Sequence, residues 1–268
     1  MRDTSSEIAG TGPGGPDRIR LDQLLVARGF YATRARARDA IQRGVVAVAG
    51  TVETKPGALV PGNAPIIAAD PAARYVSRGA LKLIAALDTF GLSPAGRACL
   101  DIGASTGGFT QVLLERGARS VTAIDVGHGQ LDRTLAADPR VGAVEGLNAR
   151  DLTLVDVPEP PEFVTADVSF ISLTLALPPA LALARPGAVV VALIKPQFEV
   201  GRDGIGKGGI VRDAEAAETA ACGIETFLEA QGWRLIGRIA SPIEGGDGNR
   251  EYLVAAEKPE AVRRSAPL

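Results

Sequence analysis

The chain of 268 residues has few of the residues that build disulfide scaffolds, metal centres or histidine-based triads. Its two cysteines, Cys99 and Cys222, stand in apolar stretches without the spacing of metal ligands. A single histidine, His128, excludes a histidine-rich metal site and disfavours a Ser-His-Asp triad, although one histidine could still act as a base. This cysteine usage is typical of a reducing compartment, so we expect a cytoplasmic protein that needs no metal.

Aromatic residues make up 4% of the chain, whereas hydrophobic residues make up 46% and charged residues 22%. This composition is that of a soluble globular protein with a core of Ala, Val, Leu and Ile. No apolar run approaches the ~20 residues needed to span a bilayer. The N-terminus also lacks the basic-then-apolar pattern of a signal peptide. We therefore expect neither membrane insertion nor a membrane partner.

Charge is distributed unevenly, although the net charge is only −2. Between Arg18 and Lys82, eleven basic residues stand against four acidic ones, and the rest of the chain has eighteen against twenty-seven. A basic module on an acidic body is typical of proteins in which one part holds a polyanion and another performs chemistry. Solvated helix faces are the alternative explanation.

The basic stretch predicts a small α+β domain at residues 18–69, after a Gly/Pro-rich tail at residues 1–17. Leucines at helical spacing predict a first helix from Leu21, and Thr33 is a plausible cap for a second helix at 34–43. A hairpin around residues 45–53 and a strand at 65–68 follow. The arginines predicted to bind the phosphates of a polyanion are Arg18, Arg20, Arg34, Arg36, Arg38 and Arg43.

After a predicted linker at 70–77, the pattern changes to alternating strands and helices at residues 78–257, before a charged tail at 258–268. This alternation predicts a doubly wound, Rossmann-like α/β domain with a largely parallel sheet covered by helices on both faces. The predicted strands are 98–102, 120–125, 142–145, 163–166, 188–193, 233–241 and 252–256, and the main predicted helices are 79–90, 109–116, 172–184 and 214–230.

The segment CLDIGASTGGFT (residues 99–110) follows a strand and opens a helix, where a nucleotide-binding fold holds its cofactor. Asp125, twenty-two residues after Gly103, ends the next strand and could accept hydrogen bonds from ribose hydroxyls. Asp101 before the first glycine and the absence of Gly-x-Gly-x-x-Gly favour S-adenosyl-L-methionine over NAD; a plain strand–helix turn is the alternative. The predicted cofactor-binding residues here are Asp101, Gly103, Ala104, Ser105, Gly107, Gly108, Phe109 and Asp125.

Three polar residues end the following strands. Asn148 could read the edge of the adenine, or it could merely cap a loop. Asp167 and Lys195 end neighbouring predicted strands, where a buried lysine is costly unless it is paired. We therefore expect an ion pair between them, whose role is either catalytic or purely structural.

Five motifs make the sequence similar to a known family: VSRGALKL (76–83), DIGASTGGFT (101–110), DVSFIS (167–172), KPQFE (195–199) and GNREY (248–252). Together they resemble the TlyA family of ribosomal RNA 2'-O-methyltransferases, also known as haemolysins. The resemblance implies an RNA-binding domain of the ribosomal protein S-four type, followed by an FtsJ-type methyltransferase domain. It also implies a catalytic set of Lys82, Asp167, Lys195 and Glu251, the cofactor S-adenosyl-L-methionine, and ribosomal RNA or subunits as the partner, methylated on a cytidine ribose.

In the implied reaction the ribose 2'-hydroxyl attacks the sulfonium methyl group in line, and no metal is needed. Lys195 is expected either to accept the proton, with Lys82 as a second cation that favours the neutral amine, or to orient the hydroxyl. Asp167 and Glu251 hold the two ammonium groups.

Three alternatives compete with this function. A methyltransferase of bases or small molecules is disfavoured by DVSF, which stands where adenine N-methyltransferases often carry an Asp/Asn-Pro-Pro-aromatic motif. A ribosome-assembly factor without activity is disfavoured by the complete catalytic set. A pore-forming haemolysin is disfavoured by the lack of a spanning segment.

Overall fold

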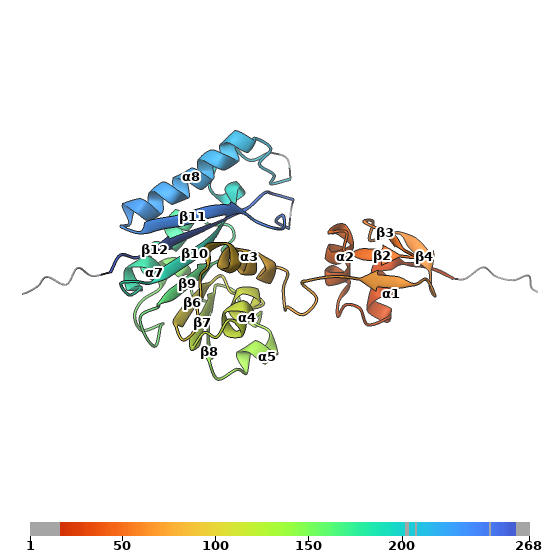
Figure 1. The fold of residues 1–268 in the computed structure, drawn as a ribbon, viewed down its shortest axis with the longest axis horizontal. Coiled ribbons are helices and arrows are strands. Elements are labelled where there is room, and N and C mark those ends of the chain that lie inside the picture. The colour runs from red at the N-terminus through yellow and green to blue at the C-terminus, as the bar shows by residue number, and fades with distance from the viewer. Residues whose placement is uncertain (1–16, 202–203, 207, 247, 261–268) are drawn as a thin grey trace, which may run out of the picture. The chain divides into compact units, whose positions relative to one another are not determined.

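Two units, divided between Ala73 and Arg74, make up the described part of this computed structural model (Figure 1). The structure describes residues 17–201, 204–206, 208–246 and 248–260. The predicted tails, at 1–17 and 258–268, therefore lie almost entirely outside the described residues.

The first unit places two helices against short antiparallel strands. Leu21, Leu24 and Leu25 of the first helix pack against Ala37 and Ile41 of the second. Both helices, the hairpin and the last strand were predicted, whereas the pair formed by β1 and β4 was missed. The elements are β1 (Arg18–Arg20), α1 (Leu21–Ala27), α2 (Arg34–Gln42), β2 (Val46–Val48), β3 (Thr51–Val52), β4 (Leu59–Pro61) and β5 (Ile66–Ala68).

Asp22 is a fully buried carboxylate that joins the two helices of this unit. It accepts hydrogen bonds from Arg20 Nε at 3.1 Å and from Arg34 at 2.9 Å. The Arg20 hydrogen bond, assisted by Arg34, lowers the pKa of Asp22 to about 2 despite its burial.

A second ion cluster holds the end of the first unit. Arg43 contacts Asp39 at 2.8 Å and Asp70 at 2.9 Å, and the Tyr31 hydroxyl donates to Asp70 at 3.1 Å. Asp70 therefore packs with the first unit, although it begins the predicted linker at 70–77. Tyr75, near the end of that segment, is buried in a core cluster of the second unit.

Seven strands of the described residues form one sheet in the second unit, in the order β11-β12-β10-β9-β6-β7-β8. The neighbours from β10 to β8 pair in parallel, as the alternating pattern predicts, whereas β12 runs antiparallel to both β10 and β11. The strands are β6 (Ala98–Ile102), β7 (Ser120–Asp125), β8 (Val141–Glu145), β9 (Phe163–Ala166), β10 (Val189–Ile194), β11 (Arg234–Ala240) and β12 (Tyr252–Glu257).

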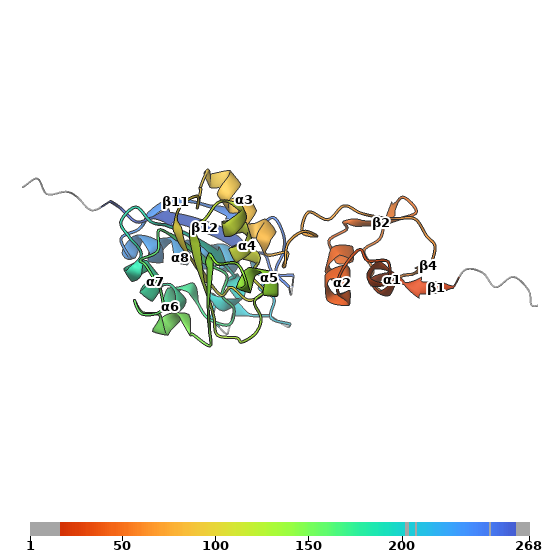
Figure 2. The ribbon, with the colours of Figure 1, turned by 90° about the horizontal axis from the view of Figure 1, so that it is seen from below.

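Helices cover both faces of this sheet (Figures 1 and 2). Strand side chains alternate: Val190 and Ala192 pack on the side of α6–α8, whereas Val189 and Val191 pack on the side of α3 and α4. The helices are α3 (Ala80–Phe90), α4 (Gly108–Glu115), α5 (Arg133–Ala136), α6 (Leu173–Ala176), α7 (Pro178–Leu183) and α8 (Ala214–Ala230), with 3-10 turns η1 (Ala149–Asp151) and η2 (Pro196–Phe198).

The single helix predicted at residues 172–184 is wrong, because the structure divides it into α6 and α7 at Leu177. Pro178 and Pro179 lack the N–H groups that would continue the first helix. Pro178 instead occupies the first position of α7, where no intrahelical N–H bond is required.

We expect Asp22→Ala to lower the free energy of unfolding by about 1–3 kcal/mol at pH 7, because it removes the acceptor that joins two arginines. The pKa of Asp22 is depressed in the folded state, so the stability it contributes is present above about pH 4. The difference between wild type and variant should shrink as the pH falls towards 2. Urea unfolding across this range measures it, and a difference independent of pH would contradict the ion-pair explanation.

Candidate active site

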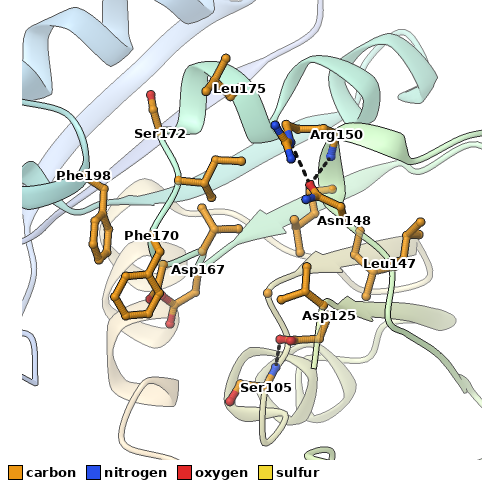
Figure 3. A pocket seen from close by; sticks show the side chains of 18 of the residues that line it. Ser105, Asp125, Leu147, Asn148, Arg150, Asp167, Phe170, Ser172, Leu175 and Phe198 are labelled. Carbon is orange, nitrogen blue, oxygen red and sulfur yellow. Dashed lines mark hydrogen bonds between the residues drawn. The ribbon is translucent and has the colours of Figure 1, made fainter. Parts of the chain in front are cut away.

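The carboxyl ends of the parallel strands border a cavity of about 880 Å³ (Figure 3). Asp125 of β7, Asn148 after β8 and Asp167 after β9 all line it. A second cavity of about 220 Å³ shares Gly103, Ser105, Asp167 and Ser169 with the first and is also lined by Lys195. The two cavities therefore adjoin at the ends of β6 and β9.

The loop between β6 and α4 requires two of its glycines for steric reasons. Gly103 has a φ of +78°, and a β-carbon there would lie 2.6 Å from the carbonyl oxygen of Asp167. At Gly107, with φ +95°, a β-carbon would lie 2.4 Å from a methyl of Leu135. Of the predicted loop residues, Gly103, Ala104, Ser105, Gly108 and Phe109 line a cavity, whereas Gly107 does not.

Backbone N–H groups fix the carboxylate of Asp125 in the wall of the large cavity. One oxygen accepts from Ser105 N at 2.8 Å and the other from Gly127 N at 2.7 Å. A carboxylate has about four lone-pair sites, so each oxygen can accept a further hydrogen bond from a ligand. Gln130 accepts from the Ser105 hydroxyl at 3.1 Å and lines the same wall.

Asn148 lines the cavity and caps a turn at the same time (Figure 3). Its Oδ1 accepts from Arg150 N at 3.1 Å and from Arg150 Nε at 3.2 Å. The loop-cap interpretation is therefore seen in the structure, and contact with an adenine stays a prediction.

Asp101 lines neither of the two cavities. Its carboxylate is fully buried and accepts from Thr110 Oγ1 at 2.7 Å and from Thr165 Oγ1 at 2.8 Å. Burial raises the pKa of Asp101 to about 6, against the lowering effect of the two threonine hydrogen bonds. Asp101 thus joins β6, β9 and the first turn of α4, and its contact with the cofactor stays a prediction.

Lys195 and Asp167 form the ion pair that the sequence predicts, at the ends of β10 and β9. Lys195 Nζ lies 2.6 Å from Asp167 Oδ1, in a charge contact that lacks the alignment of a directed hydrogen bond. The same ammonium donates to Ser169 Oγ at 2.9 Å. Asp167 and Lys195 remain partly exposed, at 25% and 12% of their side chains, and both line the small cavity.

Lys82 and Glu251 form a second ion pair, which is buried and lines neither cavity. The antiparallel register of Ile194 with Tyr252 places Lys195 opposite Glu251 at the ends of β10 and β12. The N-terminal end of α3 also lies against this site, since a β-carbon at Gly79 would be 3.7 Å from Asp167 Oδ2. All four residues of the implied catalytic set therefore gather at one end of the sheet.

Most of the predicted RNA-binding arginines have partners within the first unit. In the described residues, only Arg38 of the six lacks a polar contact. Arg20 and Arg34 hold Asp22, yet their side chains remain 44% and 53% exposed, whereas Arg43 is 14% exposed. Arg18 donates to Leu59 O at 2.7 Å, and Arg36 donates to Ala73 O at 3.2 Å. RNA contact stays a prediction for the set, and Arg43 is placed as a structural residue.

Sequence analysis missed several residues that line the cavities. Ser77 and Ser169 stand within the quoted motifs, so their positions were available from the sequence. Phe170 is 92% exposed with a φ of +65°, and its ring centroid lies 5.3 Å from that of Phe198. Neither this exposure nor the contact follows from a hydrophobic pattern.

Among the described residues, no group of three or more His, Cys, Asp or Glu side chains could hold a metal ion. In the same part of the chain, no helix combines the length and apolar character needed to cross a membrane.

We expect the free energy of unfolding of the wild-type protein to fall with rising pH because of Asp101, and we expect the Asp101→Asn variant to lack this fall. Because the pKa of Asp101 is raised to about 6, the folded protein binds more protons than the unfolded chain between about pH 4 and 6. Stability should therefore fall over this range, and the variant should be more stable by about 1–3 kcal/mol at pH 7.5. Its amide can donate to Thr165, whose hydroxyl can turn towards Leu100 O. Parallel wild-type and variant profiles in urea unfolding would show that Asp101 is not the group responsible.

Comparison with known proteins agrees with this geometry. A model of FtsJ-like methyltransferases matches residues 75–258, and an S4 domain model matches residues 19–66. The chain is 43% identical to the 16S/23S rRNA (cytidine-2'-O)-methyltransferase TlyA of Mycobacterium tuberculosis, over 88% of this chain and 89% of that protein. It is 39% identical to hemolysin A of Brachyspira hyodysenteriae, over 88% and 98%.

A solved structure described as a hemolysin of Streptococcus thermophilus is 40% identical, with a TM-score of 0.71 over 94% of this chain and 93% of that one. The matched ranges include every residue of the two ion pairs. The chain therefore belongs to the FtsJ-like methyltransferase family, in the TlyA group that carries an S4 domain in front of the catalytic domain.

Proposed function

We propose that this chain transfers a methyl group from S-adenosyl-L-methionine to the 2'-hydroxyl of a ribose, in a cytidine of ribosomal RNA. The observation that carries this proposal is the meeting of Lys195–Asp167 and Lys82–Glu251 beside two adjoining cavities. The rRNA methyltransferase among the relatives gives the substrate class.

The large cavity fits a nucleoside with an attached amino-acid group. Gly103 leaves no room for a side chain at the closest approach of the loop. Asp125 is oriented by two backbone N–H groups and would accept from the ribose of the cofactor, and Asn148 would face the base. When bound, S-adenosyl-L-methionine supplies an electrophilic methyl group on a sulfonium.

Lys195 would orient the attacking oxygen. Its ammonium lies 2.6 Å from the Asp167 carboxylate, and an ammonium group donates hydrogen bonds and accepts none. A neutral hydroxyl held by this ammonium becomes strongly acidic once its oxygen has gained a methyl group. Its proton can then pass to Asp167 or to water, so a neutral lysine is not required before the transfer. The buried ion pair of Lys82 and Glu251 would support Lys195 and Asp167 at the same end of the sheet without lining either cavity.

The direct test is transfer of radiolabelled methyl groups from S-adenosyl-L-methionine to purified ribosomal subunits that lack the modification. We expect label in the 2'-O position of one or a few cytidines, identified by mapping of 2'-O-methyl positions. Label on a base would place the enzyme in another class of RNA methyltransferase. Intact cofactor binding without any label would favour an assembly factor that lacks activity.

Lys195→Ala should reduce methyl transfer by at least ~100-fold while cofactor binding is retained, because the group that aligns the 2'-oxygen is lost. Lys258→Ala is the control, since Lys258 caps α7 by donating to Leu181 O at 2.9 Å and to Ala184 O at 2.7 Å, at the opposite edge of the sheet. Single-turnover rates and calorimetric titration of the cofactor measure the two effects. Near-normal turnover of the Lys195 variant would remove Lys195 from the mechanism.

A further inference from the structure

We propose that the catalytic unit carries its own phosphate-binding rim, formed by Arg150, Arg212 and Arg250, which grips the RNA backbone on both sides of the reacting nucleotide. This inference rests on the proposed function for the identity of the polyanion. The observation behind it is a difference in ion pairing between the two ends of the parallel strands. We call the end at which these strands begin the amino edge of the sheet, and the end at which they stop the carboxyl edge.

At the amino edge of the parallel strands, several arginines are paired with carboxylates, whereas the guanidinium of Arg97 donates, in the described part of the chain, only to the backbone oxygen of Glu162. Arg119 contacts Glu159 at 3.0 Å and Glu162 at 3.1 Å. Arg140 contacts Asp138, and Arg234 contacts Glu257. Such paired guanidinium groups have little capacity left for a phosphate.

At the carboxyl edge, the three rim arginines are exposed and have no carboxylate contact among the described residues. Arg150 bonds to Asn148 through its backbone N and its Nε, which fixes the side chain and leaves its terminal nitrogens open. The guanidinium fork binds phosphate oxygens in a bidentate manner, so an arginine without a partner is suited to RNA.

Several acidic residues that the structure describes at the carboxyl edge accept hydrogen bonds from backbone N–H groups and not from arginines. Asp213 accepts from Glu215 N at 2.9 Å as the cap of α8, Asp132 accepts from Thr134 N at 2.8 Å, and Glu199 accepts from Leu173 N at 2.9 Å. Asp151 and Glu244 are exposed at the same edge, so the rim is a set of individual arginines rather than a uniformly positive patch.

The chain segments that carry Arg212 and Arg250 are joined by the buried side-chain amide of Asn249. Asn249, 2% exposed, accepts from Val211 N at 2.9 Å and donates to Gly209 O at 2.9 Å. This side chain therefore joins the segment that carries Arg212 to the residue before Arg250. Two arginines on cross-linked segments lose less conformational entropy on binding a phosphate chain than two on separate loops.

The rim brackets the reacting groups. Arg250 precedes β12 and Arg150 follows β8, and five strand spacings separate these strands, about 24 Å across the edge. Asp167 and Lys195 end β9 and β10, between the two sides. An RNA strand crossing this edge would meet an arginine on each side of the catalytic pair, and such phosphate contacts fix register without reading sequence.

The test compares two double variants of the full chain with the same change in net charge. In Arg212→Gln/Arg250→Gln the rim loses two guanidinium groups, and in Arg140→Gln/Arg234→Gln the opposite edge loses two. Affinity for a short fluorescein-labelled single-stranded RNA is measured by anisotropy at several salt concentrations, together with the melting temperature and the affinity for the cofactor.

We expect the rim variant to bind about 10-fold more weakly, with a salt dependence shallower by about 0.7 for every phosphate that the variant no longer neutralises. The control variant should keep the wild-type slope. Arg212→Lys/Arg250→Lys should restore most of the slope, because counterion release depends on charge. Arg150→Gln, tested alone, should show the same kind of loss in RNA affinity and salt dependence.

If the rim and control variants lost RNA affinity equally, the effect would come from net charge alone and the proposed rim would be wrong. An unchanged slope in the rim variant would do the same. RNA binding is measured without turnover, so a wild-type chain that binds RNA in this way but transfers no methyl group would contradict the proposed function alone.

Discussion

The burial of the Lys82 ammonium group at one end of the sheet is the constraint on which the arrangement of the active site depends. Lys82 and Glu251 are exposed over only 7% and 2% of their side chains, although 169 residues separate them in the chain. Removing either partner would leave a buried charge unpaired, at a cost of about 3–5 kcal/mol. The start of α3, before the sheet, and the start of β12, its last strand, must therefore meet. Lys195 and Asp167 lie at the same end of the sheet, so the pairing that the buried lysine requires also brings the proposed reacting groups together.

Much of the fold could be predicted because the strands and helices of the second unit have different periodicities. Strand positions came from short apolar runs, and the parallel arrangement followed from their alternation with helices. The antiparallel direction of β12 could not be read in this way, because pairing direction is set by the path of the chain around the sheet and not by side-chain pattern. The division of α6 from α7 was available in principle, since Pro178 and Pro179 interrupt the predicted helix.

The candidate site was predictable where a residue ends a strand, and less so where a side chain could point either way. Asp125, Asp167 and Lys195 follow from strand ends, and all three line a cavity. Asp101 shares a strand face with Cys99, which packs on the side of α3 and α4, and its carboxylate is buried against Thr110 and Thr165 instead of lining either cavity. The arginines of the first unit were chosen from the charge pattern together with the family resemblance. The charge pattern cannot show that buried or half-buried aspartates of the same unit already bind the guanidinium groups of Arg20, Arg34 and Arg43.

The two edges of the sheet differ because helices begin at only one of them. In a doubly wound fold each helix that follows a strand starts at the carboxyl edge, where its first N–H groups need acceptors. Asp132, Glu199 and Asp213 supply such acceptors here, and a carboxylate that holds a helix start is no longer directed at an arginine. At the amino edge, Glu159 and Glu162 bind Arg119 and Arg185, and Glu162 also accepts a hydrogen bond from Ala98 N at 2.9 Å. The architecture thus leaves cations open on the edge where the ligands bind, and a polyanionic substrate can use them without any change to the core.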